Sequence, residues 1–317
     1  MKLNRSNKFD GVSGPLLTIV MDGVGLAAPG GGNAVDAAYT PTLDMLMKKY
    51  PMVTLRAHGK AVGLPSDDDM GNSEVGHNAL GSGQVFAQGA LLVSNSIASG
   101  KMFESKTWLD AVDNVKKNGS TLHFLGLFSD GNVHSNIAHL RSMIEHAKKD
   151  GIRTVRVHIL LDGRDVGETT ALDYVEPFEA FLASLRSPDF DAQIASGGGR
   201  MRITMDRYEA DWSMVERGWH THVLGDGRMF ASAEEAIKTL REETHAIDLD
   251  PFVIAKDGKP VGTIEDGDSV IFFNFRGDRS LEISRTFEAG EDFDKFDRVR
   301  APKVYYAGML EYDGDLH

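Results

Sequence analysis

Two apolar runs and the segment between them indicate the fold. The runs are Thr121-Leu122-His123-Phe124-Leu125-Gly126-Leu127-Phe128 and Val155-Arg156-Val157-His158-Ile159-Leu160-Leu161. Both are apolar enough for central strands of a sheet, and residues 137–149 between them have the spacing of an amphipathic helix. Strand, helix and strand in this order predict an α/β layer architecture with a mostly parallel sheet.

The same pattern extends along the chain in both directions. Upstream, residues 15–21 predict a buried strand, residues 40–50 predict an N-capped helix, and residues 53–57 predict another strand. Downstream, residues 193–196 and 269–273 are short apolar stretches that run into polar loops. The predicted fold class is therefore α/β.

Polar side chains follow four of these predicted strands. Because strand ends of open α/β sheets gather at one edge, we expect Asp, His and Arg side chains from the four loops to lie together. The loops contain Ser129-Asp130-Gly131-Asn132-Val133-His134, Asp162-Gly163-Arg164-Asp165, Gly197-Gly198-Gly199-Arg200 and Arg276-Gly277-Asp278-Arg279.

Arginines are the commonest charged residues in or just beyond these loops. A guanidinium offers a planar fork of donors that matches phosphate and carboxylate oxygens. Any one of these arginines could be a solvated surface charge, but five of them in an acidic protein favour a site for a phosphorylated acid. They are Arg164, Arg200, Arg207, Arg276 and Arg279.

Two further residues in the loops are open to two interpretations. His134 could be an ordinary loop histidine, or it could donate to a phosphoryl oxygen and stabilise charge during transfer. Asp165 could merely pair with a nearby cation, or it could accept a proton from a substrate hydroxyl as a base.

Ser73 is the candidate nucleophile, in the run Asp69-Met70-Gly71-Asn72-Ser73-Glu74-Val75-Gly76-His77. A serine hydroxyl needs a base, a lowered pKa or a metal to react at neutral pH, and no Ser-His-Asp pattern surrounds this one. Asp22 stands at the end of the strand predicted at 15–21. A carboxylate and a seryl oxygen are hard ligands suited to Mg or Mn.

Composition excludes several classes of function. The chain has 317 residues, of which 41% are hydrophobic, a net charge of -13 and no cysteine. The charge opposes binding to nucleic acid and to anionic membranes, and the missing cysteine removes disulfides and thiolate chemistry. Dinucleotide and P-loop patterns are absent, which argues against a nucleotide cofactor. Neither a secretory signal nor a stretch of about 20 apolar residues is present, so we expect a cytoplasmic protein.

Taken together, six motifs closely resemble those of the cofactor-independent (2,3-bisphosphoglycerate-independent) phosphoglycerate mutase family. Their residues are similar to those of its plant and trypanosomatid branch. The resemblance implies an alkaline-phosphatase-like phosphatase domain with an inserted α/β transferase domain. The motifs are Met21-Asp22-Gly23-Val24-Gly25, Gly71-Asn72-Ser73-Glu74-Val75-Gly76-His77, Asp162-Gly163-Arg164-Asp165, Ser196-Gly197-Gly198-Gly199-Arg200, Met205-Asp206-Arg207-Tyr208 and Phe275-Arg276-Gly277-Asp278-Arg279.

The resemblance also implies an activity and a set of roles. The family is a metal-dependent isomerase of glycolysis and gluconeogenesis that interconverts 3-phosphoglycerate and 2-phosphoglycerate through a phosphoserine, without 2,3-bisphosphoglycerate. It implies that Ser73 is phosphorylated and that Asp22 and Ser73 ligate one of two divalent ions, Mn or Mg and in some cases Co. It assigns substrate binding to His134, Arg164, Asp165, Arg200, Arg207, Arg276 and Arg279.

The family extends far beyond the last residue of this chain. We therefore expect residues 88–301 to form the transferase domain, and residues 1–87 and 302–317 to form an incomplete phosphatase domain. The remaining metal ligands would lie in the missing segment, which a separate chain could supply, so this chain alone should turn over substrate poorly. The alternatives are another phosphomutase or phosphohydrolase of the alkaline phosphatase superfamily, or a noncatalytic fragment that binds phosphorylated acids.

Overall fold

The computed structural model describes residues 8–21, 23–244 and 246–314. The chain divides into two compact units between Leu55 and Arg56. The first unit contains helices α1 (Ala34–Ala37) and α2 (Pro41–Lys49). Helix α2 confirms the helix predicted at 40–50, with Pro41 at its first position, where the missing N–H costs nothing, and lysines in its last turn.

The prediction of strands at residues 15–21 and 53–57 is wrong. The described residues in both segments have no regular secondary structure, and their apolar side chains are exposed, as in Leu16 at 81% and Val53 at 81%. A strand is completed by the hydrogen bonds of a neighbouring strand, and no described strand pairs with either segment. Apolar and β-branched composition was therefore not sufficient to make a strand there.

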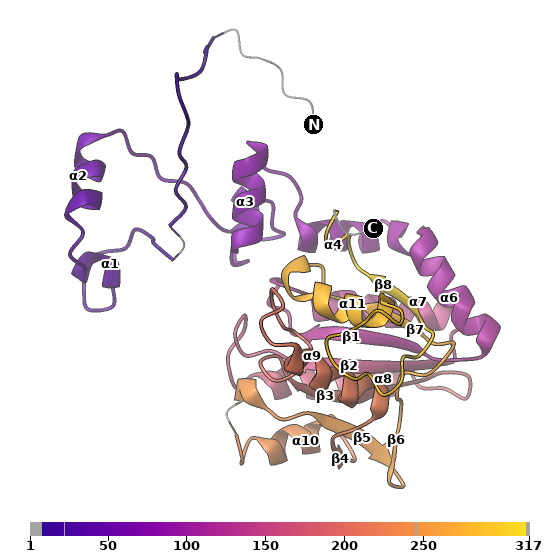
Figure 1. The fold of residues 1–317 in the computed structure, drawn as a ribbon. Coiled ribbons are helices and arrows are strands. Elements are labelled where there is room, and N and C mark those ends of the chain that lie inside the picture. The colour runs from indigo at the N-terminus through magenta and orange to yellow at the C-terminus, as the bar shows by residue number, and fades with distance from the viewer. Residues whose placement is uncertain (1–7, 22, 245, 315–317) are drawn as a thin grey trace. The chain divides into compact units, whose positions relative to one another are not determined.

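One sheet organises the second unit (Figure 1). The described strands lie in the order β4-β5-β3-β2-β1-β7-β8, and β6 pairs with β5. Strands β1, β2, β3, β7 and β8 are parallel to their neighbours among these five, whereas β5 is antiparallel to β3. Their bounds are β1 (Leu122–Phe128), β2 (Thr154–Leu161), β3 (Asp191–Gly199), β4 (Arg228–Phe230), β5 (Phe252–Lys256), β6 (Lys259–Pro260), β7 (Ser269–Phe272) and β8 (Tyr305–Gly308).

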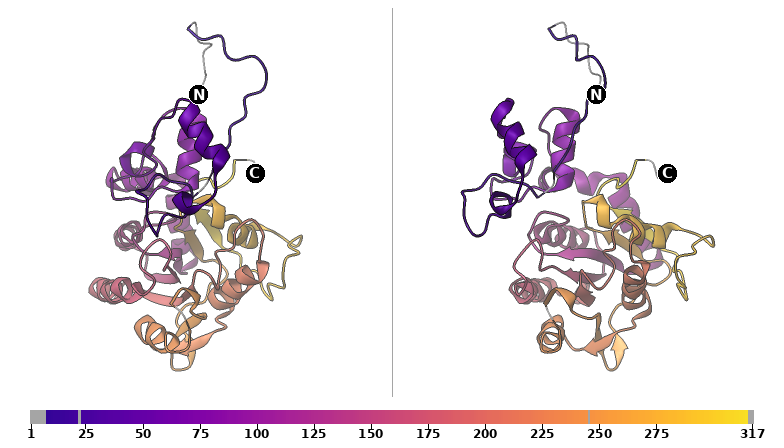
Figure 2. Two further views of the ribbon diagram at one scale, coloured as in Figure 1. Left: turned by 90° about the vertical axis from the view of Figure 1, so that its left-hand side faces the viewer. Right: turned by 60° about the vertical axis from the view of Figure 1, so that its left-hand side comes forward.

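Helices cover both faces of this sheet (Figures 1 and 2). Helices α6, α7, α8 and α10 contribute to one buried apolar cluster, and α9 and α11 contribute to the other. The α helices of this unit are α3 (Ser73–Ser82), α4 (Gly89–Ala98), α5 (Lys101–Glu104), α6 (Lys106–Asn118), α7 (Ile137–Lys149), α8 (Ala171–Leu185), α9 (Trp212–Trp219), α10 (Ala233–Leu240) and α11 (Leu281–Glu288).

Shorter helical turns complete the unit. They are η1 (Gly59–Val62), the π-helical turn η2 (His220–Leu224), η3 (Ala246–Asp248) and η4 (Gly277–Arg279). None of the described helices combines the length and apolar character that crossing a membrane requires. Parallel central strands with helices on both faces confirm the α/β fold class, and the strands at 121–128 and 155–161 and the helix at 137–149 are confirmed individually.

Candidate active site

The carboxyl ends of β1, β2, β3 and β7 lie at one edge of the sheet, because these four strands are mutually parallel. The loops that follow them carry most of the side chains predicted for the site. The expectation that four strand ends bring Asp, His and Arg together is therefore confirmed by the sheet topology.

Asp162 is the centre of one part of this site. Its Oδ1 accepts the backbone N–H groups of residues 163–165 at 2.8 to 3.1 Å, and its Oδ2 accepts the hydroxyl of Ser129 at 2.6 Å. The buried guanidinium of Arg200 donates to Asp162 Oδ1 at 2.9 Å and to Asp165 Oδ2 at 2.6 Å. Asp162 therefore fixes both the loop after β2 and the direction of Arg200.

The two carboxyls beside Arg200 differ in their pKa. Burial by itself would raise the pKa of Asp162, but Arg200, the Ser129 hydroxyl and the backbone amides together lower it. The pKa of Asp165 is raised, because burial and the neighbouring Asp162 outweigh the effect of Arg200. Asp162 is thus the structural carboxylate of the pair, and Asp165 is the one whose proton affinity suits acid-base chemistry.

Asp278, in η4, is the centre of the other part. Its carboxylate lies 3.0 Å from Arg276 Nε, 3.3 Å from Arg207 Nε and 3.6 Å from His134 Nδ1. Three predicted ligand-binding residues are therefore held around one acidic side chain. The sequence interpretation assigned no role to Asp278 or Asp162, and the available signals were an acid between two arginines and an Asp-Gly pair at a strand end.

His134 is buried beside these arginines and is uncharged. Its pKa is held well below the ordinary value, first by burial and then by the guanidiniums of Arg200, Arg276, Arg279 and Arg207. Its Nδ1 forms no hydrogen bond with any described residue. A neutral imidazole in this position can donate to, or accept from, a bound molecule.

The remaining arginines lie at different depths. Arg279 donates to the carbonyl of Met205 at 2.7 Å, and its pKa is lowered by burial and by Arg200, Arg207 and Arg164. The Nε atoms of Arg200 and Arg276 are buried and form no hydrogen bond within the described part of the chain. Arg164 is exposed, with Nη1 3.5 Å from the sulfur of Met201. The buried Arg200 Nε–H without an acceptor and the number of guanidiniums at the site suit an anion.

Ser73 is the first residue of α3, and it lies at this cluster. The side chain of Asn72 caps the helix by accepting the N–H of Val75 at 3.2 Å. Arg276 Nη2 lies 3.4 Å from Ser73 Oγ, and Arg276 Nε lies 3.4 Å from the carboxylate of Glu74. The seryl oxygen thus has a guanidinium and a helix N-terminus beside it, and both stabilise negative charge.

The predicted metal site is not assembled by the described residues. Asp22 lies outside the described residues, and within the described ranges no three His, Asp or Glu side chains form a group that could hold a metal ion. The described residues alone therefore do not complete a divalent metal centre. Of the other predicted site residues, Ser73, His134, Asp165, Arg200, Arg207, Arg276 and Arg279 are brought together, and Arg164 lies exposed near them.

The family model described as BPG-independent PGAM N-terminus matches residues 93–314. The probable 2,3-bisphosphoglycerate-independent phosphoglycerate mutase of Leptospira interrogans is 59% identical over all of this chain and 58% of its own length. The enzyme of Trypanosoma brucei brucei is 53% identical over 95% of this chain and 55% of its own length.

A solved structure agrees with these relatives. A crystal structure of Leishmania mexicana phosphoglycerate mutase at low cobalt concentration superposes with a TM-score of 0.85 and 55% identity. It covers 89% of this chain, which in turn covers 52% of that protein. The chain thus spans little more than half the length of the relatives it matches. The chain belongs to the 2,3-bisphosphoglycerate-independent phosphoglycerate mutase family.

Proposed function

We propose that this chain carries the substrate-binding residues and the phosphoryl-accepting serine of a phosphoglycerate mutase, an isomerase of glycolysis that interconverts 3-phosphoglycerate and 2-phosphoglycerate. The observation that carries the proposal is the position of Arg276, whose guanidinium lies 3.4 Å from Ser73 Oγ and 3.0 Å from Asp278 in the arginine cluster. One anion can therefore contact the cluster and the seryl oxygen at the same time. The names of the relatives supply the identity of that anion.

The reaction would proceed in two transfers. Ser73 Oγ attacks the phosphorus of 3-phosphoglycerate and loses its proton, and the bond from phosphorus to the C3 oxygen breaks as that oxygen gains a proton. The retained glycerate turns, its 2-hydroxyl attacks phosphoserine and loses its proton, and the bond from phosphorus to Ser73 Oγ breaks as Oγ regains a proton. We propose that Asp165 exchanges these protons with the glycerate hydroxyls, since its raised pKa suits that role.

The guanidiniums and His134 would supply binding and charge stabilisation. Phosphoryl transfer depends mainly on positioning and on neutralising the equatorial oxygens, which forked donors achieve well. We assign the phosphate and carboxylate of the substrate to Arg200, Arg207, Arg276 and Arg279, with Arg164 at the exposed rim. Neutral His134 would donate to a phosphoryl oxygen.

Further parts of the proposal come from the resemblance to the family and from the composition of the chain. We propose that Asp22 and Ser73 contribute ligands to divalent ions, Mn, Mg or Co. We also propose a transferase domain at 88–301, a partial phosphatase domain formed by 1–87 and 302–317, and a cytoplasmic location. The net charge of -13 favours neither nucleic acid nor membrane as a partner.

Mass spectrometry after exposure to 3-phosphoglycerate tests the proposal. The chain is extended by the segment that the relatives have in addition, incubated with Mn, and compared with the same protein carrying Ser73→Ala. We expect phosphate on Ser73 and formation of 2-phosphoglycerate. Free phosphate as the sole product would favour a phosphohydrolase instead. If Ser73→Ala still binds 3-phosphoglycerate and the wild-type protein shows no turnover with any metal, a noncatalytic binding protein would be favoured.

A further inference from the structure

A buried chain of polar side chains crosses three central strands and ends beside the arginine cluster. Its hydrogen bonds join Asp268 to His123 at 3.0 Å, His123 to His158 at 2.9 Å, and His158 to Ser196 at 2.7 Å. They continue from Ser196 to His222 at 2.8 Å and from His222 to Thr204 at 3.1 Å. All six side chains are at most 4% exposed, so no bulk water competes for these bonds.

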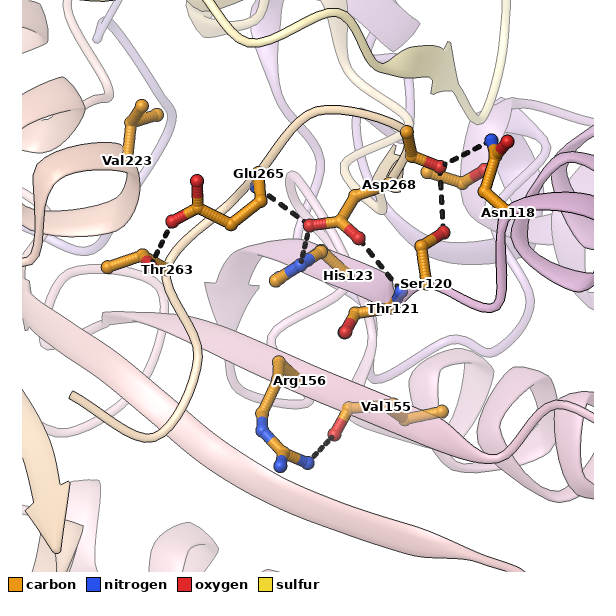
Figure 3. A network of polar contacts seen from close by, with 12 residues as sticks. Asn118, Ser120, Thr121, His123, Val155, Arg156, Val223, Thr263, Glu265 and Asp268 are labelled. Atoms are coloured by element: carbon orange, nitrogen blue, oxygen red, sulfur yellow. Dashed lines mark hydrogen bonds and ion pairs between the residues drawn. The ribbon is translucent and has the colours of Figure 1, made fainter. Parts of the chain in front are cut away.

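The carboxylate of Asp268 sets the direction of the first bonds. Figure 3 shows that it accepts the backbone N–H groups of Thr121 and Glu265, at 2.8 Å and 2.7 Å, together with the ring of His123. A carboxylate is an acceptor, so His123 carries its proton on Nε2. Nδ1 of a neutral His123 is then an acceptor and receives Nε2–H of His158.

The remaining hydrogen bonds between these polar side chains also have fixed directions. With its proton on Nε2, His158 accepts at Nδ1, and the hydroxyl of Ser196 must donate to it. Ser196 has one proton, so its second partner, Nδ1 of His222, must itself be the donor. Nε2 of His222 is left as an acceptor, and it receives the hydroxyl of Thr204.

These bond directions require neutral imidazole rings, and the surroundings of the rings favour the neutral form. Burial is the first cause that lowers the pKa of each ring, well below its usual value for His158 and to about 3 for His222. The pKa of His123 is also lowered by burial, although Asp268 acts in the other direction. Each ring therefore carries one proton, and every bond in the chain points toward Asp268.

Thr204, at the far end, has an unusual backbone. Its φ is +68°, which is rare for a β-branched residue, and the N–H of Met205 bonds back to the carbonyl of Ile203 at 2.7 Å. A positive φ with this hydrogen bond is typical of the strained form of the γ-turn. Such strain persists only where surrounding contacts enforce it.

Two neighbouring elements accommodate the Thr204 side chain. A Cβ on Gly218 in α9 would lie 2.1 Å from Thr204 Oγ1, so only glycine leaves room for that hydroxyl. His222 belongs to the π-helical turn η2, a rare geometry that proteins often place at functional sites. Three local irregularities therefore meet at one hydrogen bond.

The turn at Thr204 leads directly into the arginine cluster. The carbonyl of Met205 accepts Arg279 Nη1 at 2.7 Å, and Arg207 follows two residues later, with Nε 3.3 Å from Asp278. Rotation at Thr204 would displace both contacts. We propose that Thr204 is a positioning residue for the anion site, held by a one-directional hydrogen-bond chain whose other members are Asp268, His123, His158, Ser196 and His222.

NMR of the imidazole nitrogens in the full chain tests the direction. We expect the proton on Nδ1 of His222 and on Nε2 of His123 and His158. Ser196→Ala removes the acceptor for His222, so His222 should move its proton to Nε2 while the other two rings keep theirs. A proton on Nε2 of His222 in the wild type, or no change of its tautomer in Ser196→Ala, would overturn the proposed direction.

Calorimetry with inorganic phosphate tests the positioning role, which rests on the proposed function. Thr204→Val should bind phosphate about tenfold more weakly than the wild type, as expected for one lost buried hydrogen bond, and Thr204→Ser should restore binding. The matched control is Thr221→Val. The Thr221 hydroxyl is equally buried, but it donates to the Arg217 carbonyl, which is not part of the hydrogen-bond chain that begins at Asp268.

The outcomes separate the two proposals. Equal phosphate affinity in Thr204→Val and Thr221→Val would overturn the positioning role while leaving the anion site intact. No phosphate binding by the wild type would overturn the anion site and the positioning role together. The histidine tautomers would still test the direction of the hydrogen bonds between Asp268 and Thr204. If Thr204→Val does not fold, Gly218→Ala, which crowds the same hydroxyl, should weaken phosphate binding in its place.

Discussion

Arg276 lies with its Nη2 3.4 Å from the Oγ of Ser73, although the two residues come from opposite ends of the second unit's sequence. Ser73 opens α3, whereas Arg276 follows β7 and is only 8% exposed. The contact brings the candidate nucleophile to the edge of the sheet where the other guanidiniums gather. Arg276 is therefore the residue through which loss of anion binding can be tested most directly.

Arg276→Ala should weaken binding of 3-phosphoglycerate to this chain by about 1.5 to 3 kcal/mol, because a charge-assisted contact is removed. Titration calorimetry at constant ionic strength measures the change. Arg202→Ala is the control, since Arg202 is exposed and pairs with the half-exposed carboxylate of Asp250. If the two variants bind 3-phosphoglycerate with equal affinity, Arg276 does not belong to the binding site.

Asp162→Asn should lower the free energy of unfolding by about 3 kcal/mol. Removing one partner of a buried ion pair costs about 3–5 kcal/mol, and Asp165 remains beside Arg200 to limit the loss. Urea denaturation followed by tryptophan fluorescence measures the change. Asp250→Asn, in a half-exposed pair with Arg202, should cost less than about 1 kcal/mol. A loss in Asp162→Asn no larger than in that control would contradict the central role of Asp162.

The sequence predicted the elements whose signals are local. Residues 121–128, 137–149 and 155–161 became β1, α7 and β2, because apolar runs and helical spacing act within one element. The segment 15–21 has an equally apolar run and forms no strand, since a strand also depends on a partner. Composition cannot report whether that partner is present.

Much the same division holds for the site. The arginines and His134 could be predicted, because residue type and position at a strand end are both visible in a sequence. The roles of Asp162 and Asp278 depend on distances between separate loops, as between Asp278 and Arg207. His123 and His158 stand within apolar strands, where nothing in the sequence distinguishes a hydrogen-bonded chain from ordinary core residues.

Gly197→Ala should destabilise the fold by about 1–3 kcal/mol, in the range of overpacked cores. A Cβ at Gly197 would lie 2.6 Å from the Phe252 ring and 2.7 Å from the Ile159 carbonyl, in the middle of the sheet. Gly76→Ala is the control, because nothing lies within 4 Å of its Cβ and alanine favours the helix. Denaturation midpoints should move in opposite directions, and a loss of stability in both variants would contradict the packing argument.

Buried neutral histidines should make stability depend on pH. Above the ordinary pKa of 6.5, folded and unfolded chains are both neutral at these rings and differ little. Below pH 6.5 the histidines of the unfolded chain bind protons, whereas the buried rings of the folded chain stay neutral. The free energy of unfolding therefore falls as the pH falls toward the lowered pKa of the folded state. His139, on α7, is the clearest case, since burial lowers its pKa to about 4.

His139→Gln should therefore reduce the loss of stability between pH 7.5 and pH 5.5 by about 1 kcal/mol, the linkage expected for one proton over that interval. Carboxyls with a raised pKa, such as Asp165 and Glu74, act in the opposite direction, so the difference between variants is the informative quantity. Urea denaturation at the two pH values gives that difference. Equal pH dependence in wild type and His139→Gln would show that the His139 ring gains its proton in the folded chain as well.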